Sequence, residues 1–457
     1  VYKNMIHQYR LNGYNIVLDI NSGGVHVTDD VTYDLIALLT PPLHPICPPE
    51  VIKQLESQYD KKEILGAYDD IYTLYENDTL FSEDEYEQFS DMMVSSPVKA
   101  MCLHVAHDCN LRCSYCFAST GDFGEGRKLL DADTGKKAID FLLTQSKGRK
   151  NLELDFFGGE PLMNFEVVKE IVAYARSKEK EYNKNFRFTI TTNGMLLNDD
   201  IIDYINREMS NVVLSIDGRK EVNDRVRVRC DKTGSYDKIV PNYQKLVAKR
   251  GQDQYYVRGT FTKYNLDFAK DVMHLNDIGF DQVSVEPVVA DPQQPYALTE
   301  SDLPQIFDEY ENLAKQLIEK KKNGKGFNFF HFMLDLDQGP CAIKRLRGCG
   351  CGNEYVAVTP DGDIYPCHQF VGMEEWKMGS VLDDTFDLKR KDYFAKANIY
   401  GKEDCKNCWA KFYCSGGCNA NNLQYAGDVL KPHKLSCELE KKRLECAIMI
   451  KAAMADE

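Results

Sequence analysis

The sequence contains no uninterrupted apolar run of 18 residues within its 457 positions. Because a transmembrane helix needs about 20 mostly apolar residues, we predict neither a membrane span nor a membrane partner. The start, VYKNMIHQYRLNGYNIVLDI, interrupts its apolar positions with polar ones and lacks the features of a signal peptide. These absences predict a cytoplasmic protein.

Positive charge is also in short supply. The chain has 56 Lys and Arg against 71 Asp and Glu, which gives a formal net charge of -15. Proteins that hold the phosphate backbone need a basic surface, so no nucleic-acid partner is expected. From Asp69 to Asp91 there are nine carboxylates and no Lys or Arg. This composition predicts a solvated helical linker.

Cysteine, in contrast, is abundant: there are sixteen, and ten of them follow residue 340. In a large chain without a secretion signal, closely spaced cysteines are more typical of metal ligands or catalytic thiols than of disulfides. The sequence therefore predicts metal clusters in its C-terminal part.

The N-terminal pattern is that of a small mixed module. Residues 5–39 predict three short strands and a helix, and further helices are expected over 48–58 and 61–75. This winged-helix-like shape can bind DNA or take an extended peptide along a strand edge. The acidic charge disfavours DNA, which leaves a peptide-recognition role or a purely structural N-terminal cap.

From residue 98 to about residue 287, strands alternate with helices at the spacing of a parallel barrel. Helices are expected, for example, over 133–145 and 165–180, and a connecting amphipathic helix over 302–322. In such barrels the working residues lie at the carboxyl ends of the strands. The predicted strands are 99–105, 151–157, 187–192, 211–216, 254–261 and 282–288.

The loop after the first barrel strand carries the most specific motif. Cys109, Cys113 and Cys116 have the spacing C-x3-C-x2-C. Three thiolates can hold three irons of a [4Fe-4S] cluster and leave the fourth iron open to another ligand. The alternative is a zinc site completed by Cys102 or His107, although zinc sites usually pair two C-x2-C or C/H groups.

This loop, with the aromatic Tyr115 before its third cysteine, resembles the signature of radical S-adenosylmethionine (SAM) enzymes. The resemblance implies a partial (β/α)6 barrel. It also implies that SAM binds the open iron and is cleaved to a 5'-deoxyadenosyl radical, so that the difficult chemistry belongs to the cofactor.

The stretches GGEP, TTNG, SIDG and NDRVR follow the second, third and fourth predicted strands and are similar to SAM-binding stretches of that family. A plain strand-to-helix turn is the alternative for GGEP, and a structural ion pair is the alternative for the arginine. Glu286 is expected either to face the cavity or to form a salt bridge at the barrel bottom. The resemblance assigns SAM contacts to Tyr115, Phe117, Gly158, Gly159, Glu160, Thr192, Asn193, Ser215, Asp217 and Arg227.

The C-terminal cysteines resemble the SPASM pattern, which binds two auxiliary [4Fe-4S] clusters and brings the expected total to three. The outer cluster is assigned to Cys405, Cys408, Cys414 and Cys437. The inner cluster is assigned to Cys367, Cys418 and, as first choice, Cys349, with Cys341 and Cys351 as competitors. If only three of these thiolates bind, the inner cluster keeps an open iron for a substrate thiolate.

Nearly the whole chain resembles the maturases of SCIFF peptides (six cysteines in forty-five residues), through stretches such as HQYRLNGYNIVLDINSGGVHV and GNEYVAVTPDGDIYPCHQFVG. The likeness implies a thioether between a cysteine sulfur and an acceptor residue, often threonine, in a small ribosomal peptide. It also implies a flavodoxin- or ferredoxin-type reductant. The alternatives are an anaerobic sulfatase-maturing enzyme, another radical peptide cross-linking enzyme, and a non-enzymatic iron-sulfur protein.

The expected organisation has four parts. Residues 1–90 form the recognition module that binds the leader of the peptide, and residues 91–300 form the barrel. Residues 301–340 form a connector, and residues 341–457 form the SPASM domain with a C-terminal helix. No catalytic acid or base can be assigned from the sequence.

Overall fold

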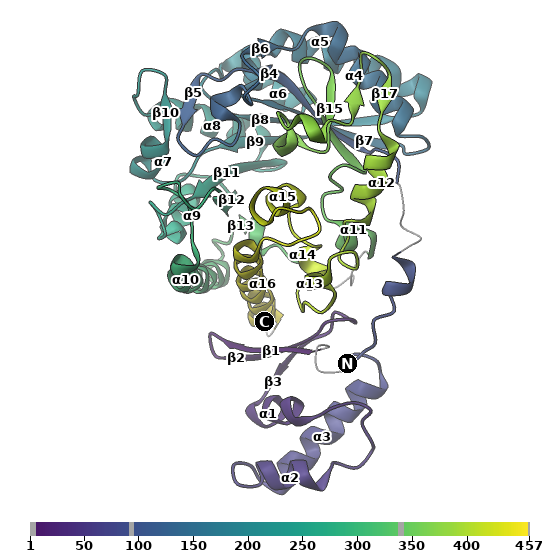
Figure 1. Cartoon of the computed structure of the whole chain (residues 1–457). Helices are drawn as coiled ribbons and strands as arrows, with labels where there is room; N and C mark the ends of the chain where they lie inside the picture. Colours follow the sequence, from purple (N-terminus) through teal and green to yellow (C-terminus); the bar gives the residue numbers. More distant parts are fainter. Residues whose placement is uncertain (1–5, 91–95, 337–341, 456–457) are drawn as a thin grey trace.

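The computed structural model describes residues 6–90, 96–336 and 342–455. A small N-terminal domain lies at one end of the molecule, beneath a barrel and a cysteine-rich C-terminal region (Figure 1). Cys341, one of the competing cluster ligands, lies outside the described residues.

The N-terminal domain has the predicted order of three strands and three helices. Strands β1 (Ile6–Leu11), β2 (Tyr14–Asp19) and β3 (Val25–Thr28) form an antiparallel sheet in the order β1-β2-β3. Val17 of β2 packs against the domain's own helices, whereas Ile16 and Leu18 join the main core of the molecule. Both faces of this sheet are therefore covered. The helices are α1 (Asp30–Leu38), α2 (Pro49–Leu55) and α3 (Lys61–Glu76).

The acidic segment after α3 differs from the predicted solvated helical linker. Its helix ends at Glu76, and only a short 3-10 turn (Glu87–Phe89) follows. Leu80 and Phe81 are buried. The carboxylate of Asp84 accepts hydrogen bonds from Tyr400 Oη at 2.8 Å and Lys411 Nζ at 2.6 Å. The prediction fails after Glu76, because Leu80 and Phe81 pack into the core of the N-terminal domain. Asp84 and Tyr86 then contact the C-terminal region.

The same region also holds the N-terminal sheet. The ring of His7 in β1 stacks on Trp409 with ring centroids 3.8 Å apart and lies 3.0 Å from a carboxylate oxygen of Glu445. Tyr9 Oη donates to the carbonyl of Glu445 at 2.9 Å. The N-terminal sheet is thus in direct contact with the C-terminal region.

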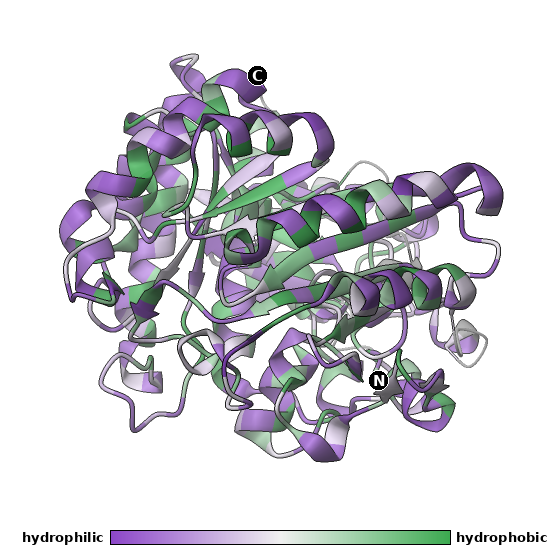
Figure 2. Cartoon of the chain, turned by 90° about the horizontal axis from the view of Figure 1, so that it is seen from above, coloured by the Kyte–Doolittle hydropathy of each residue, from purple (hydrophilic) through white to green (hydrophobic). Residues whose placement is uncertain are grey.

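Six parallel strands form the predicted partial (β/α)6 barrel, which confirms the α/β fold class. Their order in the sheet follows the sequence, and apolar residues run along them, as Figure 2 shows. The strands are β4 (Ala100–His107), β7 (Asn151–Gly158), β8 (Asn185–Thr192), β9 (Asn211–Ser215), β11 (Tyr255–Phe261) and β12 (Gln282–Pro287). The covering helices include α4 (Ala132–Gln145), α5 (Phe165–Tyr182), α6 (Asp199–Glu208), α8 (Tyr236–Arg250), α9 (Phe268–Asp277) and α10 (Leu303–Lys322).

The C-terminal region continues the barrel sheet, which the sequence did not predict. Strand β14 (Tyr355–Val358) pairs in parallel with β4, with Tyr355 opposite Ala100. The sheet then runs on through β15 (Asp363–Tyr365), β16 (Gly379–Ser380) and β17 (Thr385–Phe386). At the other edge β13 (Asn328–Phe329) pairs with β12. The remaining α-helices of the described residues are α7 (Lys220–Val226), α11 (Ala342–Arg347), α12 (Leu388–Lys396), α13 (Glu403–Lys406), α14 (Lys411–Cys414), α15 (Asn419–Ala426) and α16 (Lys434–Ala455).

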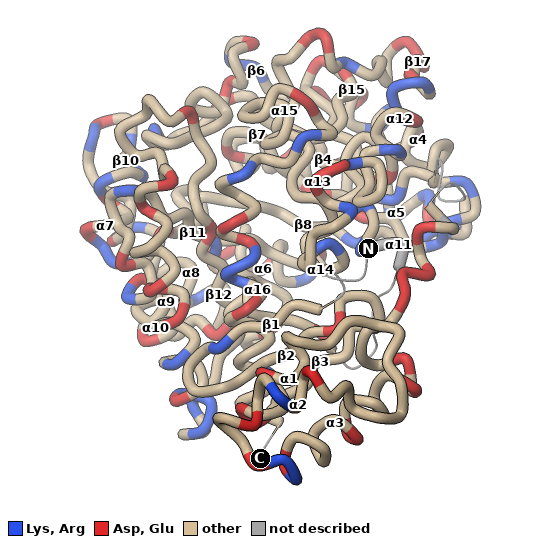
Figure 3. Tube along the Cα trace, turned by 60° about the horizontal axis from the view of Figure 1, so that its bottom comes forward, with Lys and Arg blue, Asp and Glu red and all other residues tan. Residues whose placement is uncertain are grey.

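Charges of both signs are interspersed over most of the trace (Figure 3). Among the helices of the described residues, none is long and apolar enough to cross a membrane.

Candidate active site

The three cysteines of the first motif lie together after β4. Burial, together with negative charge on Glu160, Cys113 and Cys116, raises the pKa of Cys109 to about 12, so these groups are close neighbours. Strand β5 (Leu111–Cys113) pairs with β10 (Arg227–Arg229), with Cys113 opposite Arg227. This pairing brings the predicted arginine to the cysteine loop.

Two glycines allow the end of β7 to approach that loop. Gly158 has φ +125, and a Cβ there would lie 2.2 Å from the carbonyl oxygen of Ala106. A Cβ on Gly159 would lie 2.2 Å from the carbonyl oxygen of Asp108. Such distances exclude a side chain. The glycines therefore pack strand β7 against the cysteine loop itself, whereas the sequence suggested only an approach to a ligand.

Glu160 links the ends of β7 and β8. Its buried carboxylate accepts hydrogen bonds from Thr192 Oγ1 at 2.7 Å, from Asn193 N at 2.7 Å and from Leu162 N at 3.0 Å. The bond from Leu162 caps the turn that begins at Pro161, so part of the structural alternative holds as well. Burial raises the pKa of Glu160 to about 7. Asn193 Nδ2 in turn lies 3.5 Å from the sulfur of Cys109.

A second buried polar network surrounds Tyr115 of the cysteine loop. Tyr115 Oη donates to both oxygens of Asp217, at 2.9 and 2.8 Å, and accepts from Arg227 Nη1 at 2.8 Å. Thr260 N also donates to Asp217, at 3.1 Å. Burial raises the pKa of Asp217. Burial opposes the charge of Arg227, but Tyr115, Cys113 and Asp217 outweigh it and raise the pKa of the guanidinium.

One N–H donor of Arg227 has no hydrogen-bond acceptor among the described residues. Its Nε is buried and has no hydrogen-bond partner, although the arginine lies only 3.6 Å from Asp217. A buried N–H without an acceptor is costly, so an acceptor from a bound molecule fits this position. The structural ion pair that we considered is present, and it leaves this atom free.

Ser215 and Phe117 complete the predicted set. The carbonyl of Ser215 accepts from Tyr243 Oη at 3.1 Å, and a Cβ on Gly194 would lie 2.2 Å from the Tyr243 ring. The side chain of Phe117 is 55% exposed and lies near the rings of Phe157 and His368. Only the main chain of Ser215 is engaged within the described residues, and Phe117 faces the C-terminal region.

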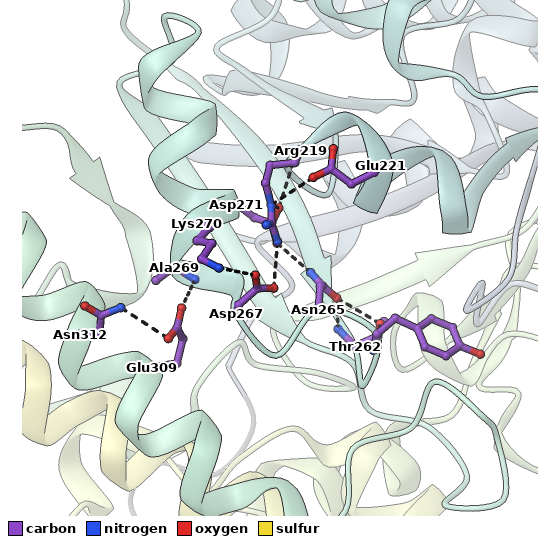
Figure 4. Close-up of polar contacts among 11 residues, drawn as sticks. Arg219, Glu221, Thr262, Asn265, Asp267, Ala269, Lys270, Asp271, Glu309 and Asn312 are labelled. Carbon is purple, nitrogen blue, oxygen red and sulfur yellow. Dashed lines mark hydrogen bonds and ion pairs between the residues drawn. The ribbon is translucent and has the colours of Figure 1, made fainter.

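The loop that carries Asp217 is supported from behind by a polar network (Figure 4). The fully buried carboxylate of Asp271 accepts hydrogen bonds from Arg219 N at 3.0 Å, Arg219 Nε at 2.8 Å and Asn265 Nδ2 at 3.1 Å. A Cβ on Gly218 would lie 2.3 Å from the Cβ of Asp271. Sequence reasoning missed this network, because no local motif marks Asp271.

The C-terminal cysteines form two groups. In the outer group, burial and the charge on Cys437 both contribute to raising the pKa of Cys405 to about 11 and that of Cys414 to about 12. Charge on Cys408 acts on Cys405 and Cys437. These are the four residues assigned to the outer cluster.

The inner group contains four cysteines where three were assigned. The thiol of Cys351 donates to Cys367, and charge on Cys349 and Cys418 acts on Cys351. The side chain of Cys349 is exposed at the surface. Desolvation by the protein around it nevertheless disfavours the thiolate and raises the pKa of its thiol. Both Cys349 and Cys351 are close to Cys367. The structure therefore does not favour either of these two competitors within the described residues as the third ligand of the inner cluster.

A single metal ion and an iron-sulfur cluster need different spacings of these cysteines. One zinc ion needs all its ligand atoms about 2.0–2.3 Å from one point. No three His, Cys, Asp or Glu side chains within residues 6–90, 96–336 and 342–455 are grouped closely enough to hold one ion. In a [4Fe-4S] cluster each thiolate binds a different iron, so its ligands stand farther apart.

Comparison with known proteins gives two family matches. Residues 103–265 match the radical SAM superfamily, and residues 349–409 match SPASM, an iron-sulfur cluster-binding domain. A cysteine-type anaerobic sulfatase-maturating enzyme of Clostridium novyi is 27% identical over 69% of this chain and 86% of its own length. An uncharacterized protein of Methanocaldococcus jannaschii is 30% identical over 63% of this chain and 90% of its own length.

Solved structures share the fold. The structure of anSMEcpe with bound SAM covers 78% of this chain and all of its own, with a TM-score of 0.66 and 20% identity. Streptococcus suis SuiB bound to SAM covers 94% of this chain and 97% of its own, with a TM-score of 0.53 and 16% identity. Both proteins have also been solved with a bound peptide, which for SuiB is the precursor peptide SuiA.

Proposed function

Because the chain belongs to the radical SAM superfamily and is an enzyme with a SPASM iron-sulfur domain, we propose that it forms thioether cross-links in a small cysteine-rich ribosomal peptide. The bond would join a cysteine sulfur to a carbon of an acceptor residue, for which we propose threonine. The observation that carries the proposal is the joining of a strand-edge recognition domain to a site with two auxiliary cysteine groups.

The cofactor residues are proposed as follows. Cys109, Cys113 and Cys116 hold the cluster that binds SAM. The free Nε of Arg227 is suited to the SAM carboxylate, and Glu160 is suited to the amino group. When bound, SAM and the reduced cluster supply a 5'-deoxyadenosyl radical. Tyr115 and Asp217 keep Arg227 in place and keep water away from it, since all three are buried or nearly so.

The N-terminal domain is proposed to bind the leader of the peptide. In its described sheet β3 pairs only with β2, so the other edge of β3 presents free backbone groups. An extended peptide can add to such an edge as a further strand. Tethering the leader there raises the local concentration of the core peptide at the barrel mouth.

The domain also contacts the part of the chain that holds the outer cysteines, because the residue that follows β2 packs beside Cys405. Ile20, Tyr400, Phe412 and Cys405 form one buried cluster. The solved SuiB structures, which cover 94% and 92% of this chain, share the fold over more of the chain than the anSMEcpe structures do, at 77–78%. This supports a peptide maturase with a recognition domain over a sulfatase-maturing enzyme.

The two auxiliary clusters are proposed to serve different tasks. The outer group has a full set of four cysteines. The inner group consists of Cys349, Cys351, Cys367 and Cys418. These cysteines either supply one thiolate to each of the four irons or leave one iron open to a substrate thiolate. An auxiliary cluster takes up the surplus electron of the oxidative reaction, and a flavodoxin or ferredoxin supplies the electron that starts it.

The test is anaerobic co-expression with the short cysteine-rich reading frames encoded beside this chain's own gene. We expect a peptide that has lost two hydrogens and one free thiol per cross-link, with the bond located by tandem mass spectrometry. Formylglycine in a sulfatase-derived peptide, with every cysteine-rich peptide unchanged, would instead establish the sulfatase-maturing alternative. A carbon-carbon link with all thiols free would establish another cross-linking chemistry.

A further inference from the structure

One charged pair projects into the interior of the barrel. On β11 the side chains of Val257 and Phe261 are buried in the main core, and Arg258 points to the opposite face. On β12 Val285 is buried in the same core, and Glu286 points to the opposite face. The side chains of Arg258 and Glu286 are 50% and 35% exposed. They are accessible charges on the inner wall.

Protein nevertheless surrounds Arg258. Its charge acts on His331 and His368, and it interacts with Tyr115 of the cysteine loop and Tyr355 of β14. These neighbours come from four separate parts of the chain. The accessible half of Arg258 therefore lies among residues of the SAM-cluster loop and of the C-terminal region. This is where the substrate of the proposed enzyme is expected to react.

Most of the hydrogen-bonding capacity of Arg258 is unused. A guanidinium has five N–H donors. Within the described residues Arg258 makes one hydrogen bond, from Nη2 to Glu286 Oε2 at 2.7 Å. The other donors are therefore available to a bound molecule.

His331 connects the surroundings of Glu286 to Arg443 of the C-terminal helix. His331 Nε2 lies 3.9 Å from Glu286 and 3.0 Å from Ser284 Oγ, and Arg443 Nη1 donates to His331 Nδ1 at 3.0 Å. Arg443 is also paired with Glu440. Glu286 and Arg443 line a cavity of about 340 Å³ that Cys414 and Cys418 also line. The pair thus lies between the SAM site and both auxiliary cysteine groups.

We propose that Arg258 binds an oxygen acceptor of the peptide substrate, beside the residue that loses hydrogen, and that Glu286 and Arg443 are positioning residues for it. This inference rests on the proposed peptide maturase function. A planar guanidinium held by one carboxylate is suited to fix a carbonyl or carboxylate oxygen in one orientation. The oxygen comes either from the peptide backbone or from an acidic side chain.

The test compares Arg258→Gln and Arg258→Lys with wild type, using the peptide that wild type cross-links. We expect Arg258→Gln to cleave SAM but to yield about tenfold to a hundredfold less cross-linked peptide per 5'-deoxyadenosine, the range for one lost charge-assisted hydrogen bond. Its KM for peptide should rise. Arg258→Lys keeps the positive charge but loses the planar, forked set of N–H donors. Its yield of cross-linked peptide per 5'-deoxyadenosine should lie between those of wild type and Arg258→Gln. Glu286→Gln should resemble Arg258→Lys.

Arg207→Gln is the matched control, because Arg207 also pairs with a neighbouring carboxylate but lies on the outside of α6, 62% exposed. Iron content and circular dichroism verify that each variant is folded and loaded. Equal product per 5'-deoxyadenosine in Arg258→Lys, Arg258→Gln and Arg207→Gln would overturn the inference while leaving the proposed function intact. Absence of cross-linking by wild type would remove the proposed function and this inference together.

The two sources of the oxygen are separated with peptide variants. If one Asp→Asn or Glu→Gln change in the peptide lowers the yield with wild type but not with Arg258→Gln, the acidic side chain is the ligand. If no such change does so, and Arg258→Gln still lowers the yield, the ligand is a backbone carbonyl.

Discussion

Asp271→Asn tests whether the polar network behind Asp217 supports the SAM site. In wild type one oxygen of Asp271 accepts from Arg219 N and Nε, and the other accepts from Asn265 Nδ2 at 3.1 Å. Asparagine removes the charge and turns an NH2 group toward one of these donors. Arg219 is 23% exposed and Asp271 is fully buried. We expect a loss of about 3 kcal/mol in the free energy of unfolding, the lower end for breaking a buried pair.

Asp267→Asn is the matched control. Asp267 pairs with the same guanidinium at 2.9 Å but is 37% exposed, so solvent screens it and its loss should cost no more than about 1 kcal/mol. Urea unfolding followed by circular dichroism measures both. Asp271→Asn should also weaken SAM binding in anaerobic titration, since Asp217 and Gly218 shift with Asp271, whereas Asp267→Asn should not. Equal losses in the two variants, or unchanged SAM affinity in Asp271→Asn, would refute the reasoning.

Three further outcomes are expected. Gly159→Ala should lower the iron count from about twelve to about eight per chain, because the Cβ of the new alanine would meet the carbonyl of Asp108 in the cysteine loop. The triple variant Cys109→Ala/Cys113→Ala/Cys116→Ala should lower it by the same amount. A count of about twelve irons in either variant would contradict this expectation. His331 has a pKa lowered to about 3 by burial, so its neutral form is favoured in the folded state and stability should fall as pH drops below about 6, by up to about 1.4 kcal/mol per pH unit. The free energy of unfolding at pH 7 and at pH 5 measures this loss. If His331→Gln shows the same difference between the two pH values as wild type, groups other than His331 cause it. Trp409→Ala removes the ring on which His7 stacks and should raise the KM for full-length precursor but not for a leaderless core peptide; equal effects on both peptides would place Trp409 outside leader recognition.

The sequence predicted most of the fold because hydrophobic periodicity is local. The six barrel strands were placed within two residues of their observed starts and ends, as with β7 over Asn151–Gly158. The acidic linker was misjudged because charge dominates its composition, whereas buried Leu80 and Phe81 decide its position. The site was predictable only where the chemistry needs a fixed spacing, as in the cysteine motifs.

Partners that are distant in the sequence could not be predicted. Nothing near Asp271 indicates Arg219, and nothing near Arg258 indicates Glu286 or His331. Arg227 was expected from a motif, but its pairing with Tyr115 depends on β10 lying beside β5. Such contacts arise from the tertiary arrangement, and an isolated sequence contains no local signal for them.

The pairing of β14 with β4 also bears on how the protein is made. Tyr355 and Ala100 are neighbours in the sheet but are separated by 255 positions, so a ribosome adding about 5–20 residues per second finishes β14 roughly 10 to 50 seconds after β4. During this time β6 (Lys128–Leu129) covers only the end of that edge of β4, at Ala106 and His107, and residues 100–103 have no strand beside them there. Unpaired edges promote aggregation. A nascent chain that waits in this state is a natural client for chaperones, and truncation before residue 355 should make the barrel insoluble.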